Sequence, residues 1–270
     1  MKKQYKRALT IAGSDPSGGA GIQADLKTFS ACGCYGMSVI VAVVDENTIG
    51  VTGVHPVPVP FVTGQIRSVL EDIGVDAVKI GMLHSSELVC AVKESLQRYQ
   101  VRNIVLDPVM AATSGDALLQ EEAIRTLKEE LIPTVRIITP NIPEAEILLG
   151  KKIERQSDLP KVIKELSFGR QVSVLLKAGH LAEEQLTDVF YNAESNELLQ
   201  FSSPRLQTRN THGTGCTLAS ALATLLAQGL GLNEAVGKAK KYMEQAIRAG
   251  ADYEIGHGHG PVHHFFRFWE

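Results

Sequence analysis

The segment Asn210–Thr217 carries the residues with the clearest potential for chemistry. It holds two glycines, a histidine, hydroxyl side chains and a cysteine, and an apolar run follows directly. If that run is a helix, the segment forms its N-terminus, where backbone N–H groups lack partners and the macrodipole is positive. We therefore predict an anion hole at Gly213, Thr214, Gly215 and Cys216. The same field is expected to lower the pKa of the Cys216 thiol. Acyl transfer and phosphoryl transfer both fit this arrangement.

A second group of candidates consists of polar residues that follow predicted strands. Asn141 and Glu144 are three positions apart at a predicted helix start, which fits either a capping box or a cation site. In the cation site, Glu144 and Asp107 would hold Mg²⁺ directly or through water, because magnesium is commonly bound by carboxylates together with substrate phosphates. Lys177 fits a point charge for nucleotide phosphates, or else a lysine that extends to solvent. The carboxyl ends of parallel strands share one edge, so these side chains are expected to converge there.

Other motifs exclude familiar nucleotide and metal sites. The glycine-rich loop at 18–21 lacks the G-x-G-x-x-G spacing, and no G-x-x-x-x-G-K-[ST] sequence occurs in the chain. Neither a dinucleotide fingerprint nor a P-loop is therefore predicted. Glycines interrupt the histidine-rich tail at 256–264, and we do not expect it to hold a structural metal ion.

Short β-branched runs alternate with apolar residues at helical spacing along the whole chain. This alternation predicts an α/β fold with a mostly parallel central sheet, helices on both faces and a small hairpin at the sheet edge. No linker or repeat is visible, so we expect a single domain over residues 1–270. The predicted strands are 9–12, 39–44, 77–80, 104–106, 137–138 and 172–176, the helices 62–72, 87–99, 121–131, 217–230 and 234–249, and the hairpin pairs 189–191 with 198–201.

The composition argues against several classes of partner. The net charge is −3, with 27 Lys and Arg against 30 Asp and Glu, so no basic surface for nucleic acid is predicted. No apolar run approaches the length of a membrane span. Four cysteines in 270 residues do not form a disulfide framework, which favours the reducing cytoplasm.

Taken in order, the motifs resemble those of the hydroxymethylpyrimidine/phosphomethylpyrimidine kinases, a family of the ribokinase superfamily. The resemblance runs from about Leu9 to the Gly-Pro-Val-His-His tail. It implies a ribokinase-like three-layer sandwich, a homodimer, and ATP-dependent phosphorylation of 4-amino-5-hydroxymethyl-2-methylpyrimidine and then of its monophosphate in thiamine diphosphate synthesis. The motifs are Ala12–Thr28, Lys79–Leu83, Asp107–Met110, Asn141 with Glu144, Lys177–His180 and Thr211–Thr217.

The same resemblance implies a role for each candidate residue. Sugar kinases of this superfamily carry aspartate, the general base, at the position of Cys216. A thiolate would serve the same purpose for the hydroxymethyl group. The resemblance implies that Gly13, Asp25, Glu46, Met82 and Val109 contact the pyrimidine, with Met82 and Val109 forming walls around the ring. It implies that Asp107 and Glu144 bind Mg²⁺ and that residues 213–216 form the anion hole. The implied nucleotide-binding residues are Asn141, Lys177 and Thr214.

Glu46 departs from the family pattern, which usually has glutamine at this position. An amide both donates and accepts hydrogen bonds, whereas an ionised carboxylate only accepts. Glu46 can accept from the exocyclic amine of the pyrimidine, but it pairs with the ring nitrogen only if one of the two is protonated. A related subgroup with the same cysteine turn phosphorylates pyridoxal, pyridoxine or pyridoxamine, so a pyridoxal kinase is the alternative.

Two further hypotheses come from other classes of protein. A cysteine hydrolase would use Cys216 with His212, but no separate His–Asp pair is evident in the sequence. A non-catalytic nucleotide-binding module would have no reason to bring carboxylates and a lysine to one edge of the sheet.

Overall fold

A computed structural model describes residues 3–110 and 119–269 of the chain. The strands are β1 (Arg7–Ala12), β2 (Tyr35–Ile40), β3 (Ala42–Glu46), β4 (Val51–Pro56), β5 (Ala77–Ile80), β6 (Ile104–Leu106), β7 (Ile137–Ile138), β8 (Ser173–Leu176), β9 (Gln185–Asn192) and β10 (Glu197–Pro204). The helices are α1 (Gly21–Ala31), α2 (Val59–Asp72), α3 (Ser86–Arg98), α4 (Glu121–Thr126), α5 (Ile142–Leu149), α6 (Leu159–Leu166), α7 (Thr214–Ala227) and α8 (Leu232–Gly250). A π-helical segment, Leu127–Leu131, continues α4.

The central sheet in the described part of the chain has eight strands, in the order β10-β9-β8-β7-β6-β5-β1-β2. Strands β2, β1, β5, β6, β7 and β8 pair in parallel, and β9 and β10 add an antiparallel hairpin at one edge. The predicted parallel sheet and edge hairpin are confirmed. The hairpin strands are longer than predicted because their pairing extends from Gln185 to Pro204.

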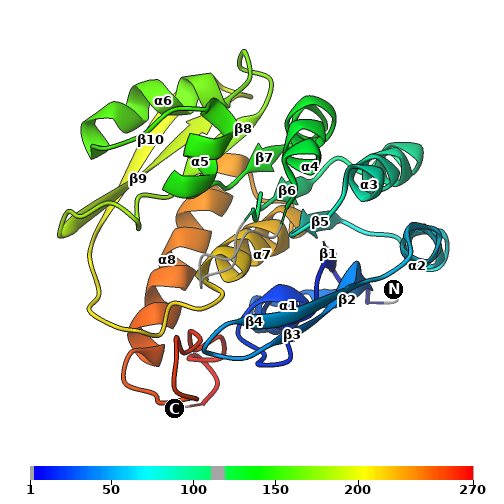
Figure 1. Ribbon diagram of the computed structural model, residues 1–270, viewed down its shortest axis with the longest axis horizontal. Coiled ribbons are helices and arrows are strands. Elements are labelled where there is room, and N and C mark those ends of the chain that lie inside the picture. Colours follow the sequence, from blue (N-terminus) through cyan, green and yellow to red (C-terminus); the bar gives the residue numbers. More distant parts are fainter. Residues whose placement is uncertain (1–2, 111–118, 270) are drawn as a thin grey trace.

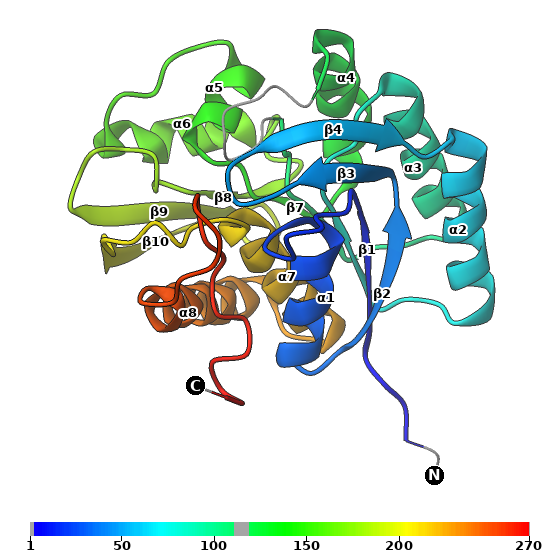
Figure 2. The same ribbon diagram turned by 60° about the horizontal axis from the view of Figure 1, so that its bottom comes forward.

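Helices cover both faces of this sheet, as Figures 1 and 2 show. Successive strand residues point to opposite faces, so Leu9 and Ile11 of β1 join one core while Ala8 joins the other. The first core contains buried residues of α2, α3, α4, α5 and α6, and the second contains those of α1, α7 and α8. The predicted three-layer sandwich is confirmed.

A second, two-stranded sheet was not predicted. The apolar run 39–44 was expected to form one strand, but β2 ends at Ile40, and β3 starts at Ala42 and pairs antiparallel with β4. The chain leaves the central sheet at Val41, whose N–H still bonds to Ala12 O at 3.0 Å. Because the run 39–44 is apolar throughout, its sequence does not indicate that the chain passes from one sheet to another there. Glu46 is the last residue of β3, so the β3–β4 hairpin (Figure 2) carries it.

Among the described residues, no helix combines the length and the apolar character that crossing a membrane requires.

Candidate functional site

A cavity of about 880 Å³ lies at the carboxyl ends of the parallel strands. A smaller cavity of about 410 Å³, near Arg7 and Asp76, contains none of the predicted site residues. The predicted residues that line the large cavity are Gly13, Glu46, Met82, Asp107, Val109, Asn141, Glu144, Lys177, Gly213, Thr214, Gly215 and Cys216. The structure therefore brings most of the residues singled out in the sequence to one cavity.

Asp25 does not follow this pattern. Its side chain is fully buried and is not among the groups that line the cavity. It accepts hydrogen bonds from Thr10 Oγ1 at 2.6 Å, Ser220 Oγ at 2.6 Å and Lys79 Nζ at 2.8 Å. Three protein donors hold the Asp25 carboxylate away from the cavity lining, so its expected contact with the pyrimidine stays a prediction.

Lys79 is the site residue that sequence reasoning missed. It is fully buried, lines the cavity and forms an ion pair with Asp25. Burial alone would lower the pKa of Lys79, but Asp25, Cys216 and Asp107 outweigh burial and raise it. The signal was available, because a lysine inside the otherwise apolar strand Ala77–Ile80 must find a buried partner.

The anion hole has the predicted backbone form. Gly213 adopts φ +74°, a left-handed conformation, and α7 begins at the next residue. A Cβ at Gly213 would lie 1.8 Å from Gly19 O, so only glycine allows the two loops to approach this closely. A Cβ at Gly215 would lie 3.1 Å from Asp107 Oδ2 and 3.4 Å from Lys177 Nζ. The turn thus places the start of α7 directly against a carboxylate and an amine.

The Cys216 thiol has the opposite pKa shift from the one expected. Burial raises the pKa of Cys216 to about 11. Lys79 and the backbone N–H of Gly21 favour the thiolate, but Asp25 and Asp107 oppose it. The prediction considered only the effect of the helix N-terminus, which lowers a thiol pKa. Burial of Cys216 in the folded chain has a larger effect in the opposite direction. The thiol is therefore protonated at neutral pH before ligands bind.

Asn141 and Glu144 form the capping box, one of the two readings left open. Asn141 Oδ1 accepts from Glu144 N at 2.9 Å, and Glu144 Oε2 accepts from Asn141 N at 2.8 Å. Both residues also line the cavity. Burial, strengthened by Asp107 and opposed by Lys177, raises the pKa of Glu144 to about 7. The same two residues can therefore cap α5 and also face a cation bound in the cavity.

Lys177 does not extend to solvent. Its side chain is 15% exposed, and Nζ lies 3.1 Å from Asp107 Oδ1, which also accepts from Thr139 Oγ1 at 2.9 Å. Burial would lower the pKa of Lys177, but Asp107 and Glu144 raise it. The amine is a fixed cation beside the anion hole, as a phosphate-binding residue requires.

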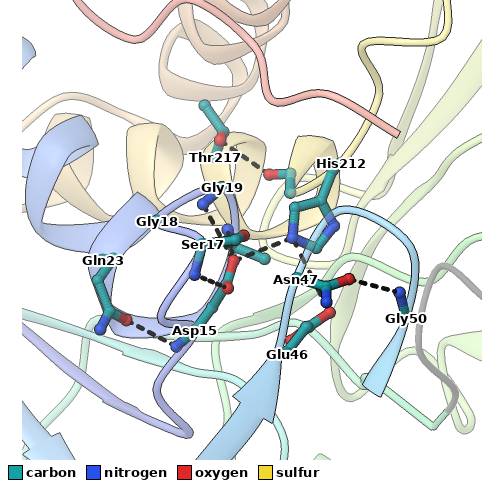
Figure 3. A network of polar contacts seen from close by, with 12 residues as sticks. Asp15, Ser17, Gly18, Gly19, Gln23, Glu46, Asn47, Gly50, His212 and Thr217 are labelled. Atoms are coloured by element: carbon teal, nitrogen blue, oxygen red, sulfur yellow. Dashed lines mark hydrogen bonds and ion pairs between the residues drawn. The ribbon is translucent and has the colours of Figure 1, made fainter. Parts of the chain in front are cut away.

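Glu46 belongs to a second charged group, with Asp15 and His212 (Figure 3). His212 Nε2 donates to Asp15 Oδ2 at 2.9 Å and lies 3.9 Å from Glu46 Oε1. Burial, with the Asp15 carboxylate nearby, raises the pKa of Glu46, and His212 opposes this. Burial would lower the pKa of His212, but Asp15 raises it. The ring nitrogen therefore favours its protonated form.

The spacing of these three side chains also fits a metal ion, since one ligand atom of each lies within 4.8 Å of the others. Asp15, however, already accepts from Ser17 N at 2.8 Å, Gly19 N at 3.0 Å and Ala20 N at 2.6 Å in addition to His212. A carboxylate with this many donors is an anion held by the backbone, and a cation would have to displace them. The ring nitrogen that would bind a metal points its proton at Asp15 instead.

The walls around Glu46 are apolar. Met82 is buried, and its Cε would lie 3.3 Å from a Cβ at Gly13, so glycine allows the thioether to sit against the loop after β1. Val109 is partly buried and packs on the same core. One end of the cavity thus suits a flat ring with a polar edge, and the other end suits phosphate groups.

The sequence pattern of phosphomethylpyrimidine kinases matches residues 15–263 of this chain. The chain belongs to this family. It is 50% identical, over 97% of this chain and 98% of the relative, to hydroxymethylpyrimidine/phosphomethylpyrimidine kinase of Escherichia coli (strain K12). Its identity to the thiamine biosynthesis bifunctional protein ThiED of Geobacter sulfurreducens is 47%, over 95% of this chain and 51% of that protein. The family resemblance read from the motifs is therefore confirmed.

The fold is also similar to that of a Bacillus subtilis pyridoxal kinase solved as an ADP complex. The two chains are 34% identical and superpose with a TM-score of 0.89 over 98% of this chain and 100% of the other. The hydrolase and the non-catalytic hypotheses are not supported, because the relatives are named as kinases.

The buried Lys79–Asp25 pair gives a prediction about stability. Lys79→Met leaves an unpaired buried carboxylate and is expected to lower the free energy of unfolding by about 3–5 kcal/mol. Adding Asp25→Asn removes that charge and keeps hydrogen bonds to Thr10 and Ser220, so the double variant should recover most of the loss. Urea unfolding measures both values.

The matched control is Lys238→Met, since Lys238 forms an exposed pair with Glu234 at 2.7 Å. Its expected cost is below about 1 kcal/mol. A double variant that is as unstable as Lys79→Met alone would contradict the proposed charge imbalance.

Proposed function

We propose that this chain transfers the γ-phosphoryl group of ATP to the hydroxymethyl oxygen of 4-amino-5-hydroxymethyl-2-methylpyrimidine and then to the phosphate of the monophosphate, in thiamine diphosphate biosynthesis. The observation that carries the proposal is that one cavity joins a ring-sized apolar end, with Glu46, to a phosphate end, with Lys177 and the anion hole. Relatives with 50% and 47% identity carry names from this pathway.

The ring end provides recognition of an aminopyrimidine. Glu46 accepts a hydrogen bond from the exocyclic amine, while Met82 and Val109 enclose the ring faces. Gly13 permits close approach of the ring to the backbone after β1. A ring donor that faces a buried carboxylate gains a charge-assisted hydrogen bond.

The phosphate end positions the nucleotide and stabilises the transferring group. Lys177 contacts the phosphates, with Asn141 and Thr214 beside it in the cavity lining. The N–H groups of residues 213–216 stabilise the charge that develops during transfer, because phosphoryl transfer depends mainly on positioning and electrostatics. An ADP complex of a structural relative supports nucleotide binding in this fold.

Asp107 and Glu144 are the residues that would hold Mg²⁺. Both are carboxylates in the cavity lining, next to the Lys177 amine. When bound, the ion neutralises phosphate charge. Burial raises the pKa of Glu144 to about 7, and a bound cation would lower it, because the positive charge favours the carboxylate.

Cys216 is the proposed general base for the first phosphorylation. The hydroxymethyl group must lose a proton, whereas the phosphate oxygen that attacks in the second phosphorylation is already ionised. The adjacent Lys79 amine stabilises the thiolate once it forms. The two reactions therefore make different demands on the same thiol.

The proposal also covers the domain organisation, the cellular location and the oligomeric state of the protein. We propose one kinase domain over residues 1–270, located in the cytoplasm, where the four free cysteines stay reduced. We also propose a homodimer. Exposed apolar side chains lie on the β3–β4 hairpin and α2, at Val43, Ile49 and Phe61, and a second copy would cover them.

The first test is an ADP-release assay with Mg-ATP. Separate reactions contain the hydroxymethylpyrimidine, its monophosphate and pyridoxal. Turnover with both pyrimidines is expected. Turnover with pyridoxal alone would assign the chain to the alternative, pyridoxal kinase, and absence of turnover with all three would contradict the assignment of the site residues.

The role of Cys216 predicts an asymmetric effect of Cys216→Ala. The first phosphorylation should slow by about 100-fold or more, the usual contribution of a general base, while the second changes little. Because the pKa of Cys216 is about 11, the wild-type rate of the first step should rise with pH up to pH 9 and above, and the variant should lose this rise. Single-turnover rates with each substrate test this. Cys90→Ala, on α3, is the control, and equal losses in both steps would exclude a base role.

The proposed cation site predicts a changed magnesium requirement. Asp107→Asn removes one carboxylate, so the Mg²⁺ concentration for half-maximal rate should increase by at least about tenfold. A magnesium titration at saturating ATP measures it, with the exposed Asp252→Asn as control. An unchanged requirement would place the ion elsewhere.

A further inference from the structure

His212 connects the ring end of the cavity to the phosphate end. It immediately precedes the anion hole, and its ring is buried between the glycine-rich loop and the β3–β4 hairpin (Figure 3). A Cβ at Gly19 would lie 2.4 Å from Cδ2 of the ring, so the imidazole packs directly on that loop. The same ring bonds to Asp15 at 2.9 Å and lies 3.9 Å from Glu46.

The backbone of His212 is fixed by the C-terminal tail. Its N–H donates to Gly260 O at 3.0 Å. The tail also donates to the hairpin that carries Glu46, from Gly258 N to Thr48 Oγ1 at 3.2 Å and from His259 N to Thr48 O at 2.8 Å. The tail therefore links the backbone of His212 to the hairpin that carries Glu46.

A further contact from the tail reaches the anion hole itself. The Thr217 hydroxyl donates to Gly213 O at 2.8 Å and accepts from His264 Nε2 at 3.0 Å. The glycine that opens α7 is thus held on one side by His264, through Thr217, and on the other by the placement of His212. The imidazole of His212 is the side chain that joins this anchored turn to Glu46.

We propose that His212 is a positioning residue that determines substrate selection, a role that rests on the function proposed above. It holds the Glu46 carboxylate in place as an acceptor for the exocyclic amine of the aminopyrimidine. A substrate ring with an ionised oxygen at that edge, as pyridoxal can present, would meet two carboxylates, Asp15 and Glu46, against the single positive charge of His212, and is disfavoured. His212 does not contact the transferring phosphoryl group.

The test is a double-mutant cycle between His212 and Glu46. His212→Ala should raise KM for the aminopyrimidine by about tenfold or more, because a misplacement near 1 Å can cost about 100-fold. KM for ATP should stay within about twofold, a split that general loss of structure would not produce. In the Glu46→Gln background, His212→Ala should have little further effect, since its action passes through Glu46.

Two further variants keep the test decisive. His212→Gln places an amide N–H group between the Asp15 and Glu46 carboxylates, so it should restore most of the selectivity for the aminopyrimidine over pyridoxal. His257→Asn changes an exposed ring in the same tail and should leave all constants unchanged. Thermal unfolding of each variant establishes that it folds.

Additive effects of His212→Ala and Glu46→Gln, or equal increases in KM for the aminopyrimidine and ATP, would overturn the inference. Failure of the proposed function is distinguishable, because it would appear as absence of pyrimidine turnover in the wild-type enzyme.

Discussion

The buried ion pair between Lys79 and Asp25 is the constraint on which the floor of the site depends. Desolvation of two charges costs several kcal/mol per ion and is offset only when each is paired and hydrogen-bonded. Asp25 on α1 accepts hydrogen bonds from Thr10 of β1, Lys79 of β5 and Ser220 of α7, which satisfy its buried charge. These four elements meet directly below Cys216. The charge balance at the thiol follows from the same contacts, because Lys79 favours the thiolate and Asp25 opposes it.

Above this floor, the site keeps two sets of charges apart. Asp107, Lys177 and Glu144 lie at the ends of β6, β8 and the start of α5, where they surround the phosphate end. Asp15, His212 and Glu46 lie on loops and the β3–β4 hairpin, at the ring end. The anion hole lies between the two sets, so a substrate oxygen and a phosphoryl group can meet there without either set competing for the other's ligand. In the proposed function, this separation would let one cavity accept first an alcohol and then a phosphate.

The sequence predicted the residues whose position depends on strand ends, because parallel strands bring their carboxyl ends to one edge whatever the details of packing. Asp107, Asn141 and Lys177 were found in this way. Three features required tertiary information. Asp25 lies within a helix, where nothing local shows that its carboxylate faces a buried lysine. The pKa of Cys216 depends on burial rather than on its helix. The β3–β4 hairpin departs from the sheet within a continuous apolar run, so the hydrophobic pattern alone does not reveal the break.

The packing role of the C-terminal tail was not predicted, because its histidines were considered only as metal ligands. Its glycines serve close packing: a Cβ at Gly258 would lie 1.8 Å from Thr48 O, and one at Gly260 would lie 2.1 Å from Asn210 Oδ1. The first of these contacts joins residues 210 positions apart in the sequence. Through the bonds of Gly258 and His259 to Thr48 and of His212 to Gly260, the tail connects the hairpin with Glu46 to the turn that precedes Cys216. The relative position of these two parts of the cavity therefore depends on a segment that lies outside the cavity's own strands and helices.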